Sequence, residues 1–96
     1  KRVDLEGVQT CLKDLPEIAD ALVLAISTDR ARENEIVAVV EAVSGGEVDV
    51  VAIRQALADR VEPYALPRRM VTVDKIPMSA AGKYDRQAAV DLFEKG

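Results

Sequence analysis

Residues 21–27 read Ala21-Leu-Val-Leu-Ala-Ile-Ser27, a short continuous apolar run that predicts a buried strand. Residues 35–43, Glu35-Ile-Val-Ala-Val-Val-Glu-Ala-Val43, form a second run that is rich in β-branched side chains and predicts another strand. The segment 28–34 between them carries several charges and predicts a turn. The centre of the fold is therefore expected to be a small sheet with helices packed on it.

A short helix is predicted before the first strand. Leu5, Val8 and Leu12 are spaced so that they share one face of a helix over residues 4–13. This helix is expected to end near Pro16, because proline disfavours helical backbone in the residue before it.

The second half of the chain also alternates between helix and strand signals. Asp49 is placed to cap a helix that runs to about Val61. Residues 70–74 alternate and predict a third strand, and Asp85 is placed to cap a last helix over residues 86–94. The element order is therefore α-β-β-α-β-α, and the fold class is α+β: a small mixed sheet of about three strands with three packed helices, in a two-layer sandwich.

Length and composition limit what the chain does alone. Its 96 residues fit one domain, and 49% hydrophobic with 31% charged residues is the balance of a globular protein. Only two Tyr and one Phe are present, so the core must be built from Val, Leu, Ile and Ala. Such a core does not enclose a large cavity, which argues against a complete small-molecule enzyme.

Charge and cysteine content indicate a soluble, cytoplasmic protein. The net charge of −4 argues against nucleic-acid binding, because an acidic surface repels phosphate backbones. No apolar run reaches the roughly 18 residues that a membrane span requires. Cys11, the single cysteine, forms no disulfide within the chain, which suits a reducing compartment.

Several kinds of catalytic site are excluded by residues that are missing. Without histidine, neither a Ser-His-Asp nor a Cys-His arrangement is possible, and one cysteine without histidine does not make a zinc site. Gly82-Lys83 has the last glycine and lysine of a phosphate-binding P-loop, but that motif needs glycine at position 77 and Ser or Thr at position 84. This chain has Pro77 and Tyr84 there, so it has no P-loop.

The other candidate residues are interpreted as structural. The carboxylate pairs Glu33/Glu35 and Glu47/Asp49 lie at predicted turns or strand ends, where charge is usually solvated surface. Cys11 flanks an apolar helical face and is interpreted as a small core residue. The connector between Pro63 and Pro67 contains Tyr64, which is expected to anchor it by packing.

Lys83 is the candidate functional residue. It follows Gly82, in a loop between Pro77 and the helix that Asp85 caps. A lysine presented in this way is a cation on a flexible stem, which reaches carboxylate or phosphate oxygens in a neighbouring site.

The segment Ile76-Pro-Met-Ser-Ala-Ala-Gly-Lys-Tyr-Asp-Arg86 resembles the C-terminal signature of the adenylate-forming superfamily, which includes acyl-CoA synthetases, adenylation domains of nonribosomal peptide synthetases and luciferase. Val61-Glu-Pro-Tyr-Ala-Leu-Pro-Arg68 and Leu15-Pro-Glu-Ile-Ala-Asp-Ala-Leu-Val23 are similar to two other segments of that family, and ordered matches run from Arg2 to Phe93. The sequence departs from the family where Tyr84 replaces Val or Ile, where Ala65 replaces Met or Lys, and at Glu33-Asn34.

The resemblance implies an ATP-dependent, AMP-forming carboxylate ligase, of which residues 1–96 would be the C-terminal small domain. It implies that Lys83 is catalytic in adenylation, with Ser79, Gly82 and Tyr84 in the loop near substrate and nucleotide. Asp85, Tyr64 and Pro67 are then structural, and no metal ligand is expected in this chain.

The same resemblance implies that most of the machinery lies elsewhere. A large N-terminal domain, with the hinge hairpin, would bind ATP or AMP with magnesium and would select the carboxylic acid. The small domain would then rotate, so that coenzyme A or a phosphopantetheinyl carrier protein takes the acyl group. The isolated chain is expected to bind no cofactor and to be inactive.

Two alternatives stay open. The chain is either the catalytic small domain of such a ligase or a non-catalytic module of the same fold that docks to a carrier protein or regulates. Retention of Lys83 favours the first, and the number of ordered matches argues against an accidental resemblance. Asp85-Arg86 after the lysine is closer to peptide-synthetase and aryl-activating members than to acyl-CoA synthetases.

Overall fold

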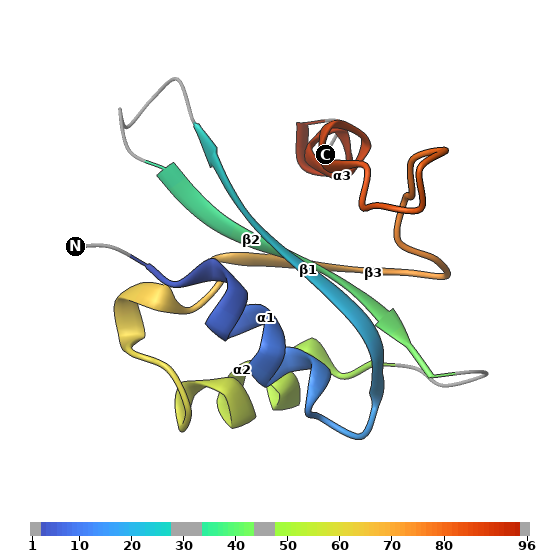
Figure 1. Cartoon of the computed structure of the whole chain (residues 1–96). Helices are drawn as coiled ribbons and strands as arrows, with labels where there is room; N and C mark the ends of the chain where they lie inside the picture. The colour runs from blue at the N-terminus through green and yellow to red at the C-terminus, as the bar shows by residue number, and fades with distance from the viewer. Residues whose placement is uncertain (1–2, 28–33, 44–47, 95–96) are drawn as a thin grey trace.

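The computed structural model describes residues 3–27, 34–43 and 48–94 (Figure 1). Within these residues the elements are α1 (Leu5–Lys13), β1 (Ile18–Ser27), β2 (Asn34–Ala42), α2 (Val50–Ala58), the short 3-10 helix η1 (Pro63–Ala65), β3 (Arg69–Val73) and α3 (Arg86–Glu94). The predicted α-β-β-α-β-α order and the α+β class are confirmed, and η1 is an addition. Residues 28–33 of the predicted turn lie outside the described residues.

The three strands form one mixed sheet in the order β1-β2-β3, with β2 at its centre. β1 runs antiparallel to β2, with Ala21 opposite Val40, and β2 runs parallel to β3, with Val39 opposite Val71. Two parallel strands need a crossover connection, and α2 with η1 lies between β2 and β3 in the chain.

Both faces of the sheet are covered by helices (Figure 1). Successive side chains of a strand point to opposite faces, so each strand contributes to two clusters. The cluster under α1 and α2 consists of Val8, Leu12, Leu15, Ile18, Ala21, Val23, Ile36, Ala38, Val40, Ile53, Leu57 and Ala65. The cluster under α3 consists of Leu22, Leu24, Ile26, Val37, Val39, Ile76, Ala89 and Phe93.

Burial on both faces explains the apolar run over residues 21–27. A strand with one solvated face would alternate between apolar and polar residues, whereas a strand covered on both faces reads as nearly continuous apolar sequence. α1 and α2 lie on one face of the sheet and α3 lies on the other, so a helical layer covers each face.

β2 and β3 are each shifted by one residue from the predicted ranges, and two other element boundaries differ by three residues. β1 begins at Ile18 rather than at residue 21, because its pairing with β2 continues past an irregularity between Ile18 and Asp20. Asp20 interrupts the apolar run there, which hid the start of the strand. α2 ends at Ala58 instead of near Val61, since the N–H groups of both Arg60 and Val61 donate to the Leu57 carbonyl and close the helix.

Polar side chains hold the sheet to the helices at its margins. The N–H of Val23 in the outer strand β1 donates to Gln9 Oε1 of α1 at 3.0 Å. On β3, Arg69 Nε donates to Glu35 Oε2 at 2.6 Å, and Arg69 Nη1 donates to the Phe93 carbonyl at 3.3 Å. The second contact satisfies a carbonyl in the last turn of α3, which has no partner within the helix.

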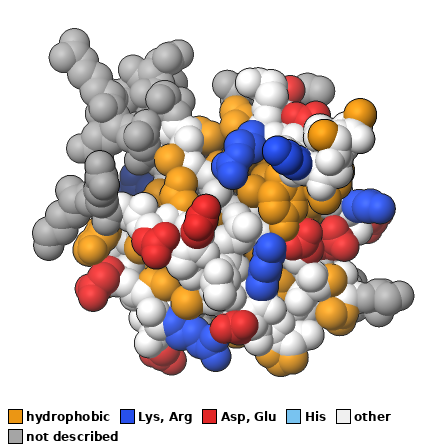
Figure 2. Space-filling model, in the orientation of Figure 1, with side chains coloured by type: hydrophobic (Ala, Val, Ile, Leu, Met, Phe, Trp, Pro, Cys, Tyr) orange, Lys and Arg blue, Asp and Glu red, His pale blue; other side chains and the backbone are white. Residues whose placement is uncertain are grey.

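Figure 2 shows lysine and arginine side chains spread over the visible face among acidic and apolar ones. They form no continuous basic surface on the described part of that face. In the described ranges, no helix combines the length and the apolar character needed to cross a membrane.

The fold predicts a large difference between two substitutions in α2. Leu57 is fully buried, and Leu57→Ala should lower the free energy of unfolding by about 2–5 kcal/mol because it leaves a cavity. Val51 on the same helix is 63% exposed, and Val51→Ala should change it by less than about 0.5 kcal/mol. Urea denaturation of the chain measures both, and equal losses would contradict the assignment of Leu57 to the core.

Candidate functional site

Residues 76–84 form a tight hairpin, named here the Lys83 hairpin, between β3 and α3. The Ser79 N–H donates to the Lys83 carbonyl at 2.7 Å, and the Gly82 N–H donates to the Ser79 carbonyl at 3.0 Å. Met78 and Tyr84 are paired as an antiparallel bridge just outside this turn. The turn over residues 80–82 therefore has the hydrogen bonds of a three-residue hairpin loop.

Gly82 gives the hairpin its shape. Its φ of 78° lies in the left-handed region, which L-residues with a Cβ rarely adopt. An added Cβ would meet no atom within 4 Å, so the requirement for glycine is conformational rather than steric. This is the position that three-residue hairpin loops commonly give to glycine.

Ser79 and Asp85 fix the two ends of the turn. The Lys83 N–H donates to Ser79 Oγ at 3.4 Å, a long hydrogen bond that adds to the two backbone bonds. The Asp85 N–H donates to the Pro77 carbonyl at 2.9 Å. Asp85 Oδ1 accepts from the Ala88 N–H at 3.0 Å and so caps α3, as its place in the sequence predicted.

The Lys83 side chain is exposed near the end of this hairpin. Together with Arg86, the first residue of α3, it lines an open cavity of about 490 Å³, to which Met78, Gly82 and Tyr84 also contribute. Among residues 3–27, 34–43 and 48–94, neither cation forms an ion pair. Of the described residues that line the cavity, the charged ones are Lys83 and Arg86, and both are cations.

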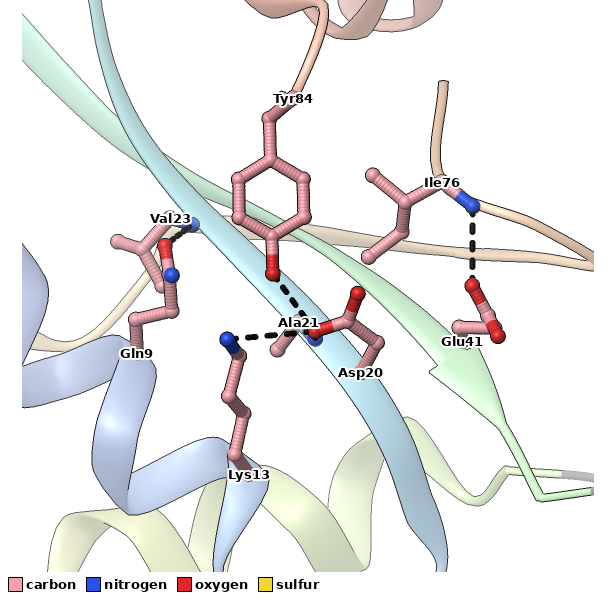
Figure 3. A network of polar contacts seen from close by, with 8 residues as sticks. All are labelled: Gln9, Lys13, Asp20, Ala21, Val23, Glu41, Ile76 and Tyr84. Atoms are coloured by element: carbon pink, nitrogen blue, oxygen red, sulfur yellow. Dashed lines mark hydrogen bonds and ion pairs between the residues drawn. The ribbon is translucent and has the colours of Figure 1, made fainter. Parts of the chain in front are cut away.

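Tyr84 also reaches across β1, with its hydroxyl toward Asp20 (Figure 3). Its hydroxyl donates to Asp20 Oδ1 at 2.8 Å, and the Lys13 ammonium of α1 lies 3.3 Å from the same oxygen. Lys13 Nζ also lies 5.4 Å from the centroid of the Tyr84 ring. Side chains from α1 and from the Lys83 hairpin thus meet at one carboxylate of β1.

The contacts of Lys13 change its titration. The Tyr84 hydroxyl raises the pKa of the Lys13 ammonium above its ordinary value of 10.5, burial acts in the opposite direction, and the Asp20 carboxylate adds to the increase. A pKa that folding raises contributes stability below the unfolded value, and that contribution is lost as the pH rises through the folded value. The contact is therefore present in full at neutral pH.

The beginning of the Lys83 hairpin is attached to the same region of the sheet. The Ile76 N–H donates to Glu41 Oε1 of β2 at 3.1 Å (Figure 3). Glu41 is the register partner of Asp20. Adjacent carboxylates on neighbouring strands therefore hold both ends of the Lys83 hairpin.

The remaining residues considered in the sequence lie away from the Lys83 hairpin. Pro67 is fully buried in the connector, whereas Tyr64 on η1 is 49% exposed. Cys11 and Tyr64 line a second cavity, of about 330 Å³, between α1 and this connector. In the acidic pairs, Glu35 binds Arg69 and Asp49 caps α2, while Glu33 and Glu47 lie outside the described residues.

Sequence reasoning did not identify the residues that support the Lys83 hairpin. Asp20, Glu41 and Lys13 bind it across long sequence separations, 64 residues in the case of Tyr84 and Asp20. The signal that could have pointed to two of them is a polar residue at each end of the apolar strands. In the described part of the chain, no group of three or more His, Cys, Asp or Glu side chains is arranged to hold a metal ion.

Residues 7–83 match the family model for the AMP-binding enzyme C-terminal domain. The chain is 37% identical over 86 residues to a chondramide synthase of Chondromyces crocatus and 33% identical over 87 residues to surfactin synthase subunit 1 of Bacillus subtilis. These alignments cover 90% and 91% of this chain but 2% of each relative. The chain thus spans only a small part of the length of the curated relatives it matches.

Solved structures give the same result. The amide bond synthetase McbA from Marinactinospora thermotolerans matches with a TM-score of 0.87 and 26% identity, over 97% of this chain and 19% of that chain. A four-domain nonribosomal peptide synthetase bound to AMP and glycine matches with a TM-score of 0.81 and 30% identity, over 91% of this chain and 6% of that one. The family model, the relatives and the fold agree, and the chain belongs to the AMP-binding enzyme C-terminal domain family, the C-terminal part of adenylate-forming enzymes.

Proposed function

We propose that this chain is the C-terminal small domain of an ATP-dependent, AMP-forming carboxylate ligase, and that Lys83 is its catalytic residue for adenylation. The observation that carries the proposal is the open cavity at the Lys83 hairpin, which Lys83 and Arg86 line without an acidic partner among the described residues. Such a cavity suits an anion that approaches from outside the domain.

The proposed chemistry requires a cation at this point. A carboxylate oxygen attacks the α-phosphorus of ATP, the bond to pyrophosphate breaks, and an acyl-adenylate forms. Because two anions must meet, a fixed positive charge stabilises the transition state. A unit-charge contact near 4 Å is worth about 4 kcal/mol at an effective dielectric constant of about 20. This corresponds to roughly 10²–10³ in rate.

The rest of the active site is assigned to a large N-terminal domain. Among the described residues no polar or charged residue is buried, and both Lys83 and Arg86 are exposed, so these two cations are open to groups from another domain. We therefore assign to the large domain most of the binding of ATP with its magnesium, and the choice of acid. Lys83 and Arg86 are the residues of this chain that would contact the anionic substrates.

The second half-reaction is proposed to use a thiol acceptor, either coenzyme A or the pantetheine of a carrier protein. The small domain would rotate after adenylation and withdraw Lys83 from the reaction centre. Support comes from the peptide-synthetase relatives, one of which has four domains and was solved with AMP and glycine bound.

Lys83→Ala in the complete ligase is expected to lower ATP–pyrophosphate exchange at least about 10²-fold, because it removes the cation from the transition state. The matched control is Lys75→Ala, which removes another exposed lysine shortly before the Lys83 hairpin and should leave exchange close to wild type. Exchange is measured over a panel of carboxylic acids, which also identifies the substrate class.

A loss below about fivefold for Lys83→Ala would remove the residue from its proposed role. The chain is tested alone and with its large domain, and exchange is expected only when both are present. Carrier-protein binding without exchange in either case would identify a docking module instead.

Gly82 offers a test of the shape of the Lys83 hairpin. Gly82→Ala should disfavour the turn by about 1–2 kcal/mol, because alanine is strained at a positive φ. Gly82→Asn should cost less, since asparagine adopts this conformation more readily. ATP–pyrophosphate exchange should therefore decrease from wild type to Gly82→Asn and further to Gly82→Ala. An equal loss in both variants would show that the turn conformation does not limit activity.

A further inference from the structure

The Tyr84 hydroxyl donates a hydrogen bond to the Asp20 carboxylate on β1 at 2.8 Å. From this contact we propose that Tyr84 is a positioning residue for Lys83, which it orients by fastening the end of the Lys83 hairpin to β1 through Asp20. The proposal rests on the proposed function of Lys83 and names a residue that acts on it.

The Asp20 carboxylate is well fixed for this purpose. Its Oδ1 accepts from the Ala21 N–H at 2.9 Å and from the Tyr84 hydroxyl at 2.8 Å, and it pairs with Lys13 Nζ at 3.3 Å (Figure 3). The Asp20 side chain is 28% exposed, so part of its surroundings is protein rather than water. A hydrogen bond to a charged acceptor is stronger than one between neutral groups.

A second tether makes the attachment specific. Glu41 holds the Ile76 N–H at 3.1 Å, and Glu41 lies beside Asp20 on the neighbouring strand. The Lys83 hairpin is thereby held to the sheet at its entrance by a backbone contact and at its exit by a side chain. Removal of the Tyr84 hydroxyl would leave the entrance attached and would break the hydrogen bond to β1 at the exit, next to Lys83, where the Asp85–Pro77 hydrogen bond and the packing of the Tyr84 ring remain.

Lys83 directly precedes Tyr84 in the hairpin. Tyr84 is paired with Met78 in an antiparallel bridge, its hydroxyl reaches Asp20 on β1, and the Lys83 side chain is exposed. The Tyr84 hydrogen bond therefore fixes the backbone from which the Lys83 ammonium extends.

Tyr84 rather than Lys13 is expected to dominate this attachment. The Lys13 side chain is 39% exposed, and ion pairs with that much solvent contribute little. Lys13→Met should accordingly affect the Lys83 hairpin less than Tyr84→Phe, which removes one oxygen and keeps the ring.

The first test uses the 96-residue chain and does not depend on catalysis. In wild type, ¹⁵N relaxation should give order parameters of about 0.85 for the Gly82 and Lys83 amides, as in rigid backbone. Tyr84→Phe should lower both values toward about 0.6, as in flexible backbone. The matched control is Tyr64→Phe, which removes the hydroxyl of the other tyrosine, on η1, and should leave the order parameters of these two amides unchanged. Unchanged amides in Tyr84→Phe would overturn the proposal.

The second test uses the complete ligase and separates positioning from general stability. Tyr84→Phe should lower kcat for adenylation about tenfold, the factor that a lost hydrogen bond to a charged group implies, with little change in KM for ATP. In a Lys83→Ala background the same substitution should cause no further loss, because Tyr84 acts through Lys83. Asp20→Asn, which keeps an acceptor oxygen, should retain more activity than Asp20→Ala.

The outcomes of the two tests are distinguishable. A tenfold loss from Tyr84→Phe that persists in the Lys83→Ala background would show that Tyr84 acts on stability or by another route, and would overturn the positioning role. If Lys83→Ala alone leaves exchange intact, the proposed function fails, and the proposal that Tyr84 positions a catalytic lysine fails with it. Loosened amides in that case would still show that Tyr84 fastens the Lys83 hairpin, so the two failures are told apart.

Discussion

Helices cover both faces of β1 and β2, and this constraint determines where the sheet carries charge. A buried strand interior excludes polar side chains without a partner, because each such group lowers the free energy of unfolding by about 1–3 kcal/mol. The described carboxylates of these strands accordingly lie toward their ends: Asp20 and Glu41 at one end of the pair, and Glu35 at the other. Each of them binds a group from a later part of the chain. Asp20 and Glu41 bind the Lys83 hairpin, and Glu35 binds Arg69, which in turn holds the last turn of α3. The apolar interior of the strands thus forms the core, and the carboxylates at the strand ends bind the segments around it.

The Lys83 hairpin is held by hydrogen bonds along its backbone, while the Lys83 side chain is exposed. Its backbone closes through Ser79 and Gly82, and Asp85 joins it to α3. These local bonds fix the path of the chain, and the hairpin is attached to the domain through the buried Ile76 side chain and through the hydrogen bonds of Ile76 and Tyr84. A lysine whose backbone is fixed before substrate arrives loses less conformational freedom on binding, which favours the bound geometry. Preorganisation of this kind is consistent with a residue that acts in the site of another domain.

Local sequence patterns predicted most of the fold and little of the support around the candidate site. The apolar runs, the helical spacing of Leu5, Val8 and Leu12, and the caps Asp49 and Asp85 depend on neighbours within a few residues, so the sequence displays them directly. The start of β1 was missed because Asp20 interrupts the run, yet that residue matters most for the Lys83 hairpin. Its partners come from positions 13 and 84, and Glu41 meets Ile76 across 35 residues. Contacts of this kind depend on strand register and on the face that α3 covers, which no local pattern specifies. Lys83 was found through its resemblance to a family motif, and its catalytic role stays a prediction, since the groups it would meet lie outside this chain.

Tyr84 stands where the family resemblance predicts an aliphatic residue, and its hydroxyl changes how the Lys83 hairpin is attached. An aliphatic side chain at this position would contribute packing alone, which tolerates small displacements along the strand. A hydrogen bond to a carboxylate that is itself held by Lys13 and by the Ala21 N–H is directional, and it restricts both the distance and the angle. In a ligase whose small domain rotates between two half-reactions, a hairpin fastened in this way moves with the sheet as one body. Rotation would then move Lys83 into and out of the reaction centre at a defined position, whereas a loosely attached loop would spread the lysine over several positions in either orientation. The Asp20–Tyr84 contact therefore links the orientation of the whole domain to the position of a single ammonium group.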